Sequence, residues 1–125
     1  MTKKNDVYKC GICGAMHQAL HDGAGDPVCC EKTMIRMKDN YTDAAVEKHI
    51  PIVKKLSDGK IEVTVGEVEH PMTIEHYIEW VELKTETTII KEFLKPGDKP
   101  VVIFSIDSDE FEVRAYCNLH GVWKA

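Results

Sequence analysis

The sequence predicts a mainly β protein in which a small, metal-stapled module precedes an antiparallel β-sandwich or barrel. Three observations lead to this fold class. Four of the five cysteines lie within the first thirty residues, short runs of β-branched and aromatic residues recur from residue 47 onward, and Gly- and Pro-containing turns separate those runs. No long stretch has the apolar spacing of an amphipathic helix. We expect two domains, residues 1–37 and residues 38–125.

The first domain has too few large aliphatic side chains to fold on apolar burial alone. Its sequence, "VYKCGICGAMHQALHDGAGDPVCCEKTMIRM", is rich in Gly and Cys. Such a segment cannot bury enough area to offset the loss of chain entropy, so it needs a metal or disulfides. The polar stretch "KDNYTDAA" that follows is interpreted as a connector.

The second domain shows the alternation of half-buried strands. In "KIEVTVGEV", Ile61, Val63 and Val65 fall on one face and the polar residues between them on the other. The runs "ETTIIKEFL" and "PVVIFSI" are further strands, and "LSDGK" and "KPGDKP" are turns in which Gly supplies positive φ and Pro presets φ. In "EFEVRAYC" the same alternation carries Phe111 inward and places Cys117 at the end of the apolar face.

The composition of the chain limits the kinds of partner that it can be expected to bind. The chain has 125 residues and a formal net charge of −5, which gives no electrostatic support for binding nucleic acid or an anionic membrane. No apolar run is long enough to cross a bilayer, and the start "MTKKNDVYKC" lacks the apolar region of a signal peptide. We therefore expect a cytoplasmic protein, in which clustered cysteines serve as metal ligands or redox groups.

A first metal site is predicted from the cysteine spacing. C-x-x-C followed by a second cysteine pair is typical of a tetrahedral sulfur site, which suits zinc or a single iron. The adjacent second pair should distort the tetrahedron. His17 and His21 lie between the two pairs and are interpreted as exposed. The expected ligands are Cys10, Cys13, Cys29 and Cys30.

A second site is suggested by the remaining cysteine and four scattered histidines. One buried thiol alone would be interpreted as a small core residue. A Cys-x-x-His near the end of a β-sandwich is also found in copper sites, but no Met follows His120 to act as the weak axial ligand. Iron would use every donor that this domain offers. The candidate ligands are His49, His70, His76, Cys117 and His120.

These motifs together resemble desulfoferrodoxin, the two-iron form of superoxide reductase, over essentially the whole chain. The matching stretches are "YKCGICG", "VCC", "AAVEKHIP", "EHPMTIEHYIEW" and "CNLHGVWKA". The resemblance implies a desulforedoxin-like first module holding one iron in four cysteines. It further implies an immunoglobulin-like β-sandwich holding a catalytic iron, with four equatorial histidines and Cys117 axial.

The same resemblance implies the activity and the partners. The chain would reduce superoxide to hydrogen peroxide with two irons, take electrons from a rubredoxin-like donor, and form a homodimer. Glu47 and Lys48 match the acid and the lysine beside the open iron position. Two other interpretations remain open on the residues alone: a non-catalytic iron or copper electron-transfer protein, and a zinc-stapled structural or binding module.

Overall fold

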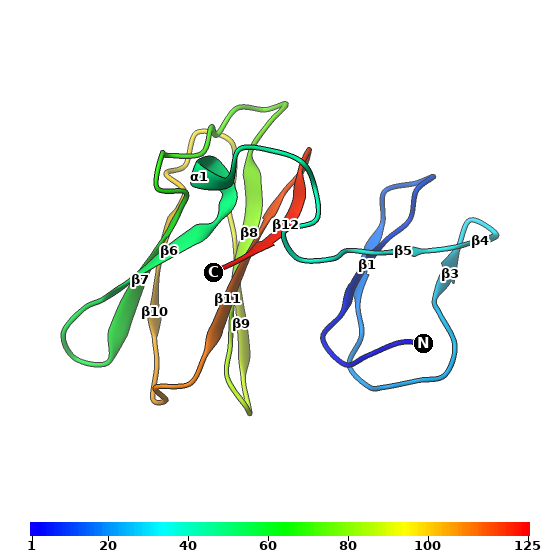
Figure 1. The fold of residues 1–125 in the computed structure, drawn as a ribbon, viewed down its shortest axis with the longest axis horizontal. Helices are drawn as coiled ribbons and strands as arrows, with labels where there is room; N and C mark the ends of the chain where they lie inside the picture. Colours follow the sequence, from blue (N-terminus) through cyan, green and yellow to red (C-terminus); the bar gives the residue numbers. More distant parts are fainter. The chain divides into compact units, whose positions relative to one another are not determined.

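The computed structural model describes residues 1–125, and the chain divides into two compact units, Met1–Lys38 and Asp39–Ala125 (Figure 1). We call them the N-terminal unit and the sandwich. The residues between Lys38 and Ala45 form neither strand nor helix, as expected of a connector. The predicted mainly β class is confirmed, since the one helix, α1 (Val46–His49), has 4 residues. No helix has the length and apolar character that crossing a membrane requires.

The N-terminal unit is built from five short strands. A three-stranded antiparallel sheet has the order β2-β1-β5, and β3 and β4 form a separate hairpin. Its buried hydrophobic residues are few, in agreement with the sparse apolar content of this segment: Val7, Tyr8, Cys10 and Met34. The strands are β1 (Val7–Lys9), β2 (Met16–Gln18), β3 (Val28–Cys29), β4 (Lys32–Thr33) and β5 (Ile35–Arg36).

The sandwich consists of two antiparallel sheets. One has three strands in the order β10-β7-β6, and the other has four in the order β12-β11-β8-β9. Its strands are β6 (Pro51–Lys55), β7 (Lys60–Val65), β8 (Ile78–Lys84), β9 (Ile89–Phe93), β10 (Val101–Ser105), β11 (Glu112–Cys117) and β12 (Gly121–Lys124).

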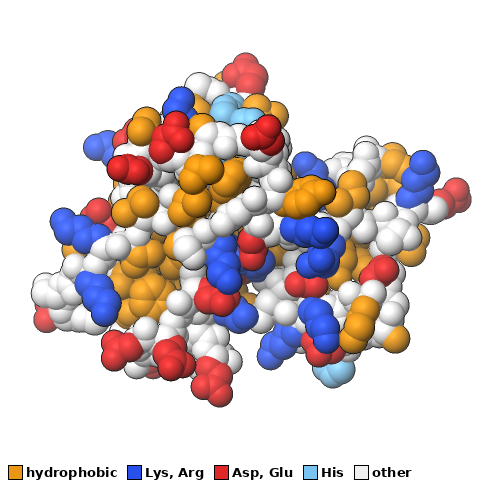
Figure 2. Space-filling view, viewed as in Figure 1, with side chains coloured by type: hydrophobic (Ala, Val, Ile, Leu, Met, Phe, Trp, Pro, Cys, Tyr) orange, Lys and Arg blue, Asp and Glu red, His pale blue; other side chains and the backbone are white.

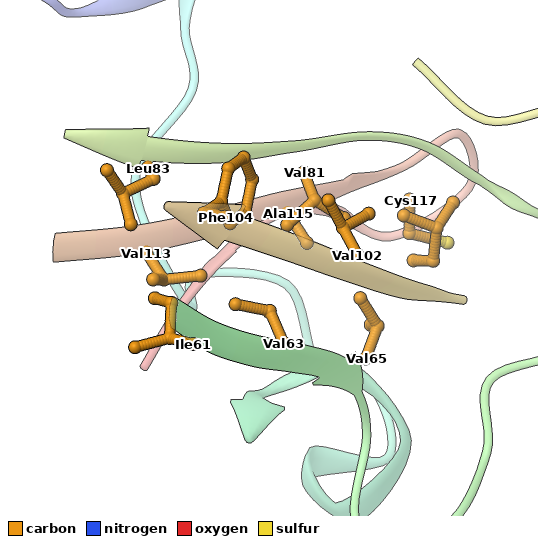
Figure 3. Packing of buried hydrophobic residues seen from close by; sticks show 11 residues of the cluster. Ile61, Val63, Val65, Val81, Leu83, Val102, Phe104, Val113, Ala115 and Cys117 are labelled. Atoms are coloured by element: carbon orange, nitrogen blue, oxygen red, sulfur yellow. The ribbon is translucent and has the colours of Figure 1, made fainter. Parts of the chain in front are cut away.

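The core lies between the two sheets, where side chains of β7 and β10 face those of β8 and β11 (Figure 3). The predicted inward face of β7 is confirmed, because Ile61, Val63 and Val65 are all buried. Cys117 is also buried, with 0% of its surface exposed, and lies at one end of this core. The strand alternation therefore delivers a thiol to the apolar interior at the end of the sandwich.

The outer face of the four-stranded sheet departs from simple alternation. Trp80 and Tyr116 are buried there and stack with ring centroids 5.7 Å apart, and Lys91 lies 3.5 Å from the Trp80 ring centroid. The carboxylate of Glu82, fully buried, is paired with Arg114 at 2.8 Å and with Lys91 at 3.2 Å. Such pairing is what permits a charged carboxylate to be buried.

Charges of both signs are interspersed on the face of the molecule that Figure 2 shows. On the face drawn in Figure 2, lysine and arginine side chains alternate with acidic ones, and apolar groups lie between them. The net charge of −5 is therefore not gathered into one acidic field on that face. Local charges near a site can then outweigh the overall charge.

Candidate metal centres

The four N-terminal cysteines converge on one point. Their sulfur atoms all lie within 4.8 Å of one another, with 3.6 Å between the Sγ atoms of Cys13 and Cys29 and 3.9 Å between those of Cys29 and Cys30. A tetrahedral ion with metal–sulfur bonds of about 2.3 Å spaces its sulfurs by about 3.8 Å. The thiol set thus fits one tetrahedral ion. His17 and His21 lie outside it and are exposed, as predicted.

The adjacent cysteine pair reaches one ion through a tight hairpin turn. β3 and β4 pair Cys29 with Lys32, so Cys30 and Glu31 form the two-residue loop between them. Both loop residues have positive φ, 52° for Cys30 and 63° for Glu31, as a type I′ turn requires. This turn places neighbouring side chains on the same ion, and it holds two non-glycine residues in the left-handed region.

Replacing Glu31 with glycine should stabilise this hairpin. Glycine adopts positive φ without the steric penalty that Glu31 bears, so we expect a gain of about 0.5–1 kcal/mol. The measurement is denaturant-induced loss of the N-terminal metal chromophore. Lys32→Gly, one residue further along in β4, is the matched control and should destabilise the same hairpin. Equal midpoints for the two variants would contradict the prediction.

Contacts within the set shift the pKa values of these thiols in opposite directions. Hydrogen bonds from the N–H groups of Cys13 and Ile12 lower the pKa of Cys10 to about 6. Contacts with the neighbouring thiols, chiefly with Cys13, raise the pKa of Cys29 to about 12. Contacts of the same kind also raise the pKa of Cys30. A cation must therefore displace protons from this set, so its uptake weakens as the pH falls.

In the sandwich, the second set of donors comes from three separate segments, one of which, the loop between β7 and β8, carries two histidines. His49 ends α1, His70 follows β7, His76 precedes β8, and His120 lies between β11 and β12. The register of β8 against β11 shifts between Tyr116 and Cys117, a bulge that re-aims the end of the strand. The antiparallel topology thereby gathers at one end of the sandwich residues that are far apart in sequence.

The four imidazole rings form a closed square. Neighbouring centroids are 4.7 Å apart for His49 and His70, 4.6 Å for His70 and His76, 5.0 Å for His76 and His120, and 4.9 Å for His120 and His49. The diagonal pair, His49 and His76, is 6.3 Å apart. Cys117 Sγ lies within 4.8 Å of the donor atoms of His49, His70 and His76, and 3.8 Å from His120 Nδ1.

The inward nitrogens differ among the rings. Nε2 of His49 lies 3.2 Å from Nε2 of His70 but 3.1 Å from Nδ1 of His120, so His120 presents its other nitrogen to the cluster. Two nitrogens at right angles, each about 2.1 Å from a metal, are about 3.0 Å apart. His76 Nε2 is buried without any hydrogen-bond partner. A metal ion at the centre of the square fits these atoms and satisfies that nitrogen.

Two of the rings are oriented by main-chain carbonyls. His49 Nδ1 contacts the carbonyl oxygen of Ala45 at 2.7 Å, and His70 Nδ1 contacts that of Pro71 at 2.7 Å. These contacts place the proton on Nδ1 and leave Nε2 free to bind a metal. Burial lowers the pKa of His49 and that of His76, and it lowers the pKa of His70 to about 4. These three rings are therefore neutral near pH 7.

Trp123 contacts two of the histidine positions, a role that the sequence motifs did not indicate. Its ring stacks on His49 at 4.8 Å and 28°, and its Nε1 donates a hydrogen bond to the carbonyl oxygen of His120 at 3.1 Å. Trp123 is buried, which fixes both contacts. The available signal was its place three residues after His120, but only the folded hairpin shows that it reaches His49.

Glu47 and Lys48 lie on α1, directly before His49, and both are exposed. The Lys48 charge contributes to lowering the pKa of His49 and of His76, after the larger effect of burial. Lys48 is therefore within electrostatic reach of both rings. The structure also closes the loop after β7 onto this helix, because the N–H of Val68 donates to the carbonyl oxygen of Glu47 at 2.8 Å.

Comparison with known proteins follows the same division of the chain. The family model described as "Desulfoferrodoxin" matches residues 41–125, and that described as "Desulfoferrodoxin, N-terminal domain" matches residues 2–37. The chain belongs to the desulfoferrodoxin family. The resemblance inferred from the sequence motifs is thus confirmed. The family binds two irons, and the two donor sets described above fit two iron ions per chain.

Individual relatives extend over the full length. The chain is 48% identical to desulfoferrodoxin of Nitratidesulfovibrio vulgaris and 46% identical to that of Syntrophotalea carbinolica, in both cases over 100% of this chain and 98% of the relative. Among solved structures, it is similar to the superoxide reductase of Treponema pallidum, with a TM-score of 0.77 and 33% identity over 98% of this chain and 99% of that one. The structural similarity and the sequence similarity therefore both extend over nearly the whole chain.

Proposed function

We propose that the chain is a superoxide reductase that converts superoxide to hydrogen peroxide: O₂•⁻ + e⁻ + 2 H⁺ → H₂O₂. The observation that carries this proposal is the square of four imidazoles with Cys117 Sγ beside it. These five donors would hold an iron and leave it accessible to one small ligand. Iron bound there supplies the single electron that the reaction needs.

The protein donors set the charge of this centre. His49, His70 and His76 are neutral at pH 7 because burial lowers their pKa values, and Cys117 would bind a metal as the thiolate. Ferrous iron with one thiolate has a net charge of +1. A small anion is therefore attracted, although the chain as a whole carries −5. The Cys117 thiolate also donates electron density to the iron, which favours transfer to the substrate.

Glu47 and Lys48 are proposed to act at the mouth of this centre. Lys48 is exposed beside His49, and its ammonium would attract superoxide and order the water that supplies the two protons. Glu47 would supply a carboxylate ligand to an iron held by the histidines and Cys117. Their support is their position on α1 and the Lys48 charge acting on His49 and His76.

Replacing Lys48 with isoleucine should slow the capture of superoxide about tenfold and make its rate less dependent on ionic strength, since electrostatic steering raises on-rates by at least that factor. The measurement is the second-order rate of superoxide decay at two or more salt concentrations. Lys55→Ile removes the same charge at the other end of β6 and should leave both quantities nearly unchanged. Equal effects of the two variants would remove the steering role.

Pulse-generated superoxide tests the activity itself. The protein is loaded with iron, assayed for two irons per chain, reduced, and mixed with superoxide while the ferrous centre and the products are followed. We expect loss of the ferrous sandwich centre together with one hydrogen peroxide per superoxide and no oxygen. One hydrogen peroxide per two superoxides, with oxygen released, would instead indicate dismutation. Iron loading without faster superoxide decay would favour a non-catalytic electron-transfer protein.

The electron donor, assembly and location belong to the same proposal. A rubredoxin-like protein is the proposed donor, because each turnover consumes one electron that the chain must regain from outside. A homodimer is supported by the small N-terminal core, which would gain from packing against a copy of itself. A cytoplasmic location is supported by cysteines arranged as metal ligands, which need a reducing compartment.

A further inference from the structure

His76, which is partly buried, is held differently from the two buried rings of the square. His49 and His70 each have an Nδ1 contact to a main-chain carbonyl oxygen at 2.7 Å. His76 makes no such ring contact, and its Nε2 is buried without a partner. No hydrogen bond of its own orients this ring, so the loop that carries it matters more, and within that loop the N–H and carbonyl of His76 bond to Thr73.

The backbone around His76 is held by the side chain of Asn118. The amide oxygen of Asn118 accepts a hydrogen bond from the N–H of Tyr77 at 3.0 Å. Its amide nitrogen donates to the carbonyl oxygen of Glu75 at 2.9 Å, and its own N–H donates to the carbonyl oxygen of Tyr77 at 3.2 Å. The two residues that flank His76 are thus tied to the residue that follows Cys117.

Only a carboxamide of this length meets both requirements. The Tyr77 N–H offers a donor and the Glu75 carbonyl offers an acceptor, which fixes the orientation of the Asn118 amide. Aspartate would keep the acceptor but place a second acceptor against the Glu75 carbonyl. Leucine has a similar volume and would leave both groups unpaired.

We propose that Asn118 is a positioning residue that holds the His76 loop against the loop bearing Cys117 and His120, and so fixes the fourth corner of the square. The proposal rests on the proposed function in so far as the ion held there is the catalytic iron. Outer-shell partners of this kind typically change metal affinity by about 10–100-fold when they are replaced. Asn118 performs through the backbone what carbonyl contacts perform for His49 and His70.

The chain provides a matched control in Asn40. Its amide nitrogen donates to the carbonyl oxygen of Lys124 at 3.2 Å, its amide oxygen accepts from the N–H of Lys124 at 2.7 Å, and its own N–H donates to Val122. This is the same three-bond pattern, made to β12 and not to a residue flanking a candidate ligand. Asn40→Asp therefore removes an equivalent clamp from the residues on either side of Trp123, without loosening the His76 loop.

The experiment compares Asn118→Asp, Asn118→Leu and Asn40→Asp in the full-length, iron-loaded protein. The rate at which iron leaves the sandwich centre for an excess of a ferrous chelator is measured, with the four-cysteine centre as internal reference. We expect release to be about 10–100-fold faster in both Asn118 variants. The thiolate-to-iron absorption band should shift in these variants and shift less in Asn40→Asp.

Each other outcome counts against the proposal. Release within twofold of the parent, or equally accelerated in Asn40→Asp, would show that the clamp only supports the fold. Acceleration in Asn118→Asp without acceleration in Asn118→Leu would assign the effect to the introduced charge. Because iron release requires no superoxide, these results stand apart from the activity, and a failure of the proposed function would be recognised separately.

Discussion

Replacement of Cys117 with serine is expected to lower superoxide reduction by more than about 100-fold, the largest effect that a single conservative change should have in this chain. Serine is nearly the same size, so the packing of the fully buried side chain is retained. Its hydroxyl keeps its proton at neutral pH, whereas the thiol loses its proton to a metal even though burial raises its pKa. The centre then loses both a negative charge and an electron-donating ligand.

The measurement combines iron content, the visible spectrum and the decay of superoxide. In Cys117→Ser the thiolate band of the sandwich centre should disappear, while the four-cysteine centre keeps its own band and serves as the control within the same molecule. Activity within tenfold of the parent, with iron still bound, would contradict the assignment of Cys117 as the functional thiolate. Unchanged iron release would weaken it further.

The strands of this protein can be predicted from the sequence because apolar residues alternate with polar ones, and the apolar residues mark the buried face of the sheet. Ile61, Val63 and Val65 repeat every second residue and are buried, and the same period carries Cys117 inward. Alternation misses Tyr116, which the pattern assigns to the outer face and which is nevertheless buried against Trp80. That burial comes from cross-strand stacking within the sheet, which a pattern along one strand does not contain.

The site can be predicted from the sequence only in part, because patterns along the chain show only what lies close together in sequence. The first cysteine set has a local signature, since four thiols lie within a short segment. The histidines come from three separate segments of an antiparallel sandwich, and no spacing along the chain shows that these meet; the family resemblance supplied that step. Contacts made after folding, such as Trp123 on His49 and Asn118 on the His76 loop, have no counterpart in any linear pattern.

Replacement of Gly66 with alanine should destabilise the sandwich by about 3 kcal/mol or more and disturb the helix that carries Lys48. Gly66 has a φ of 91°, and a Cβ there would lie 2.3 Å from the carbonyl oxygen of Val68 and 2.6 Å from that of Lys48. Left-handed strain alone costs about 1–2 kcal/mol for alanine. Backbone atoms cannot move aside as a flexible side chain can, so the clash adds to this strain.

Gly97→Ala separates the two contributions. Gly97 has nearly the same φ, 92°, but a Cβ there meets nothing within 4 Å, so this variant bears the backbone strain without the clash. Denaturant unfolding should therefore place Gly66→Ala well below Gly97→Ala in stability. Because the clash pushes on the Lys48 carbonyl, only Gly66→Ala should also slow superoxide capture in the fraction that remains folded. Equal stability and equal capture rates for the two variants would mean that the loop after β7 does not set the position of Lys48.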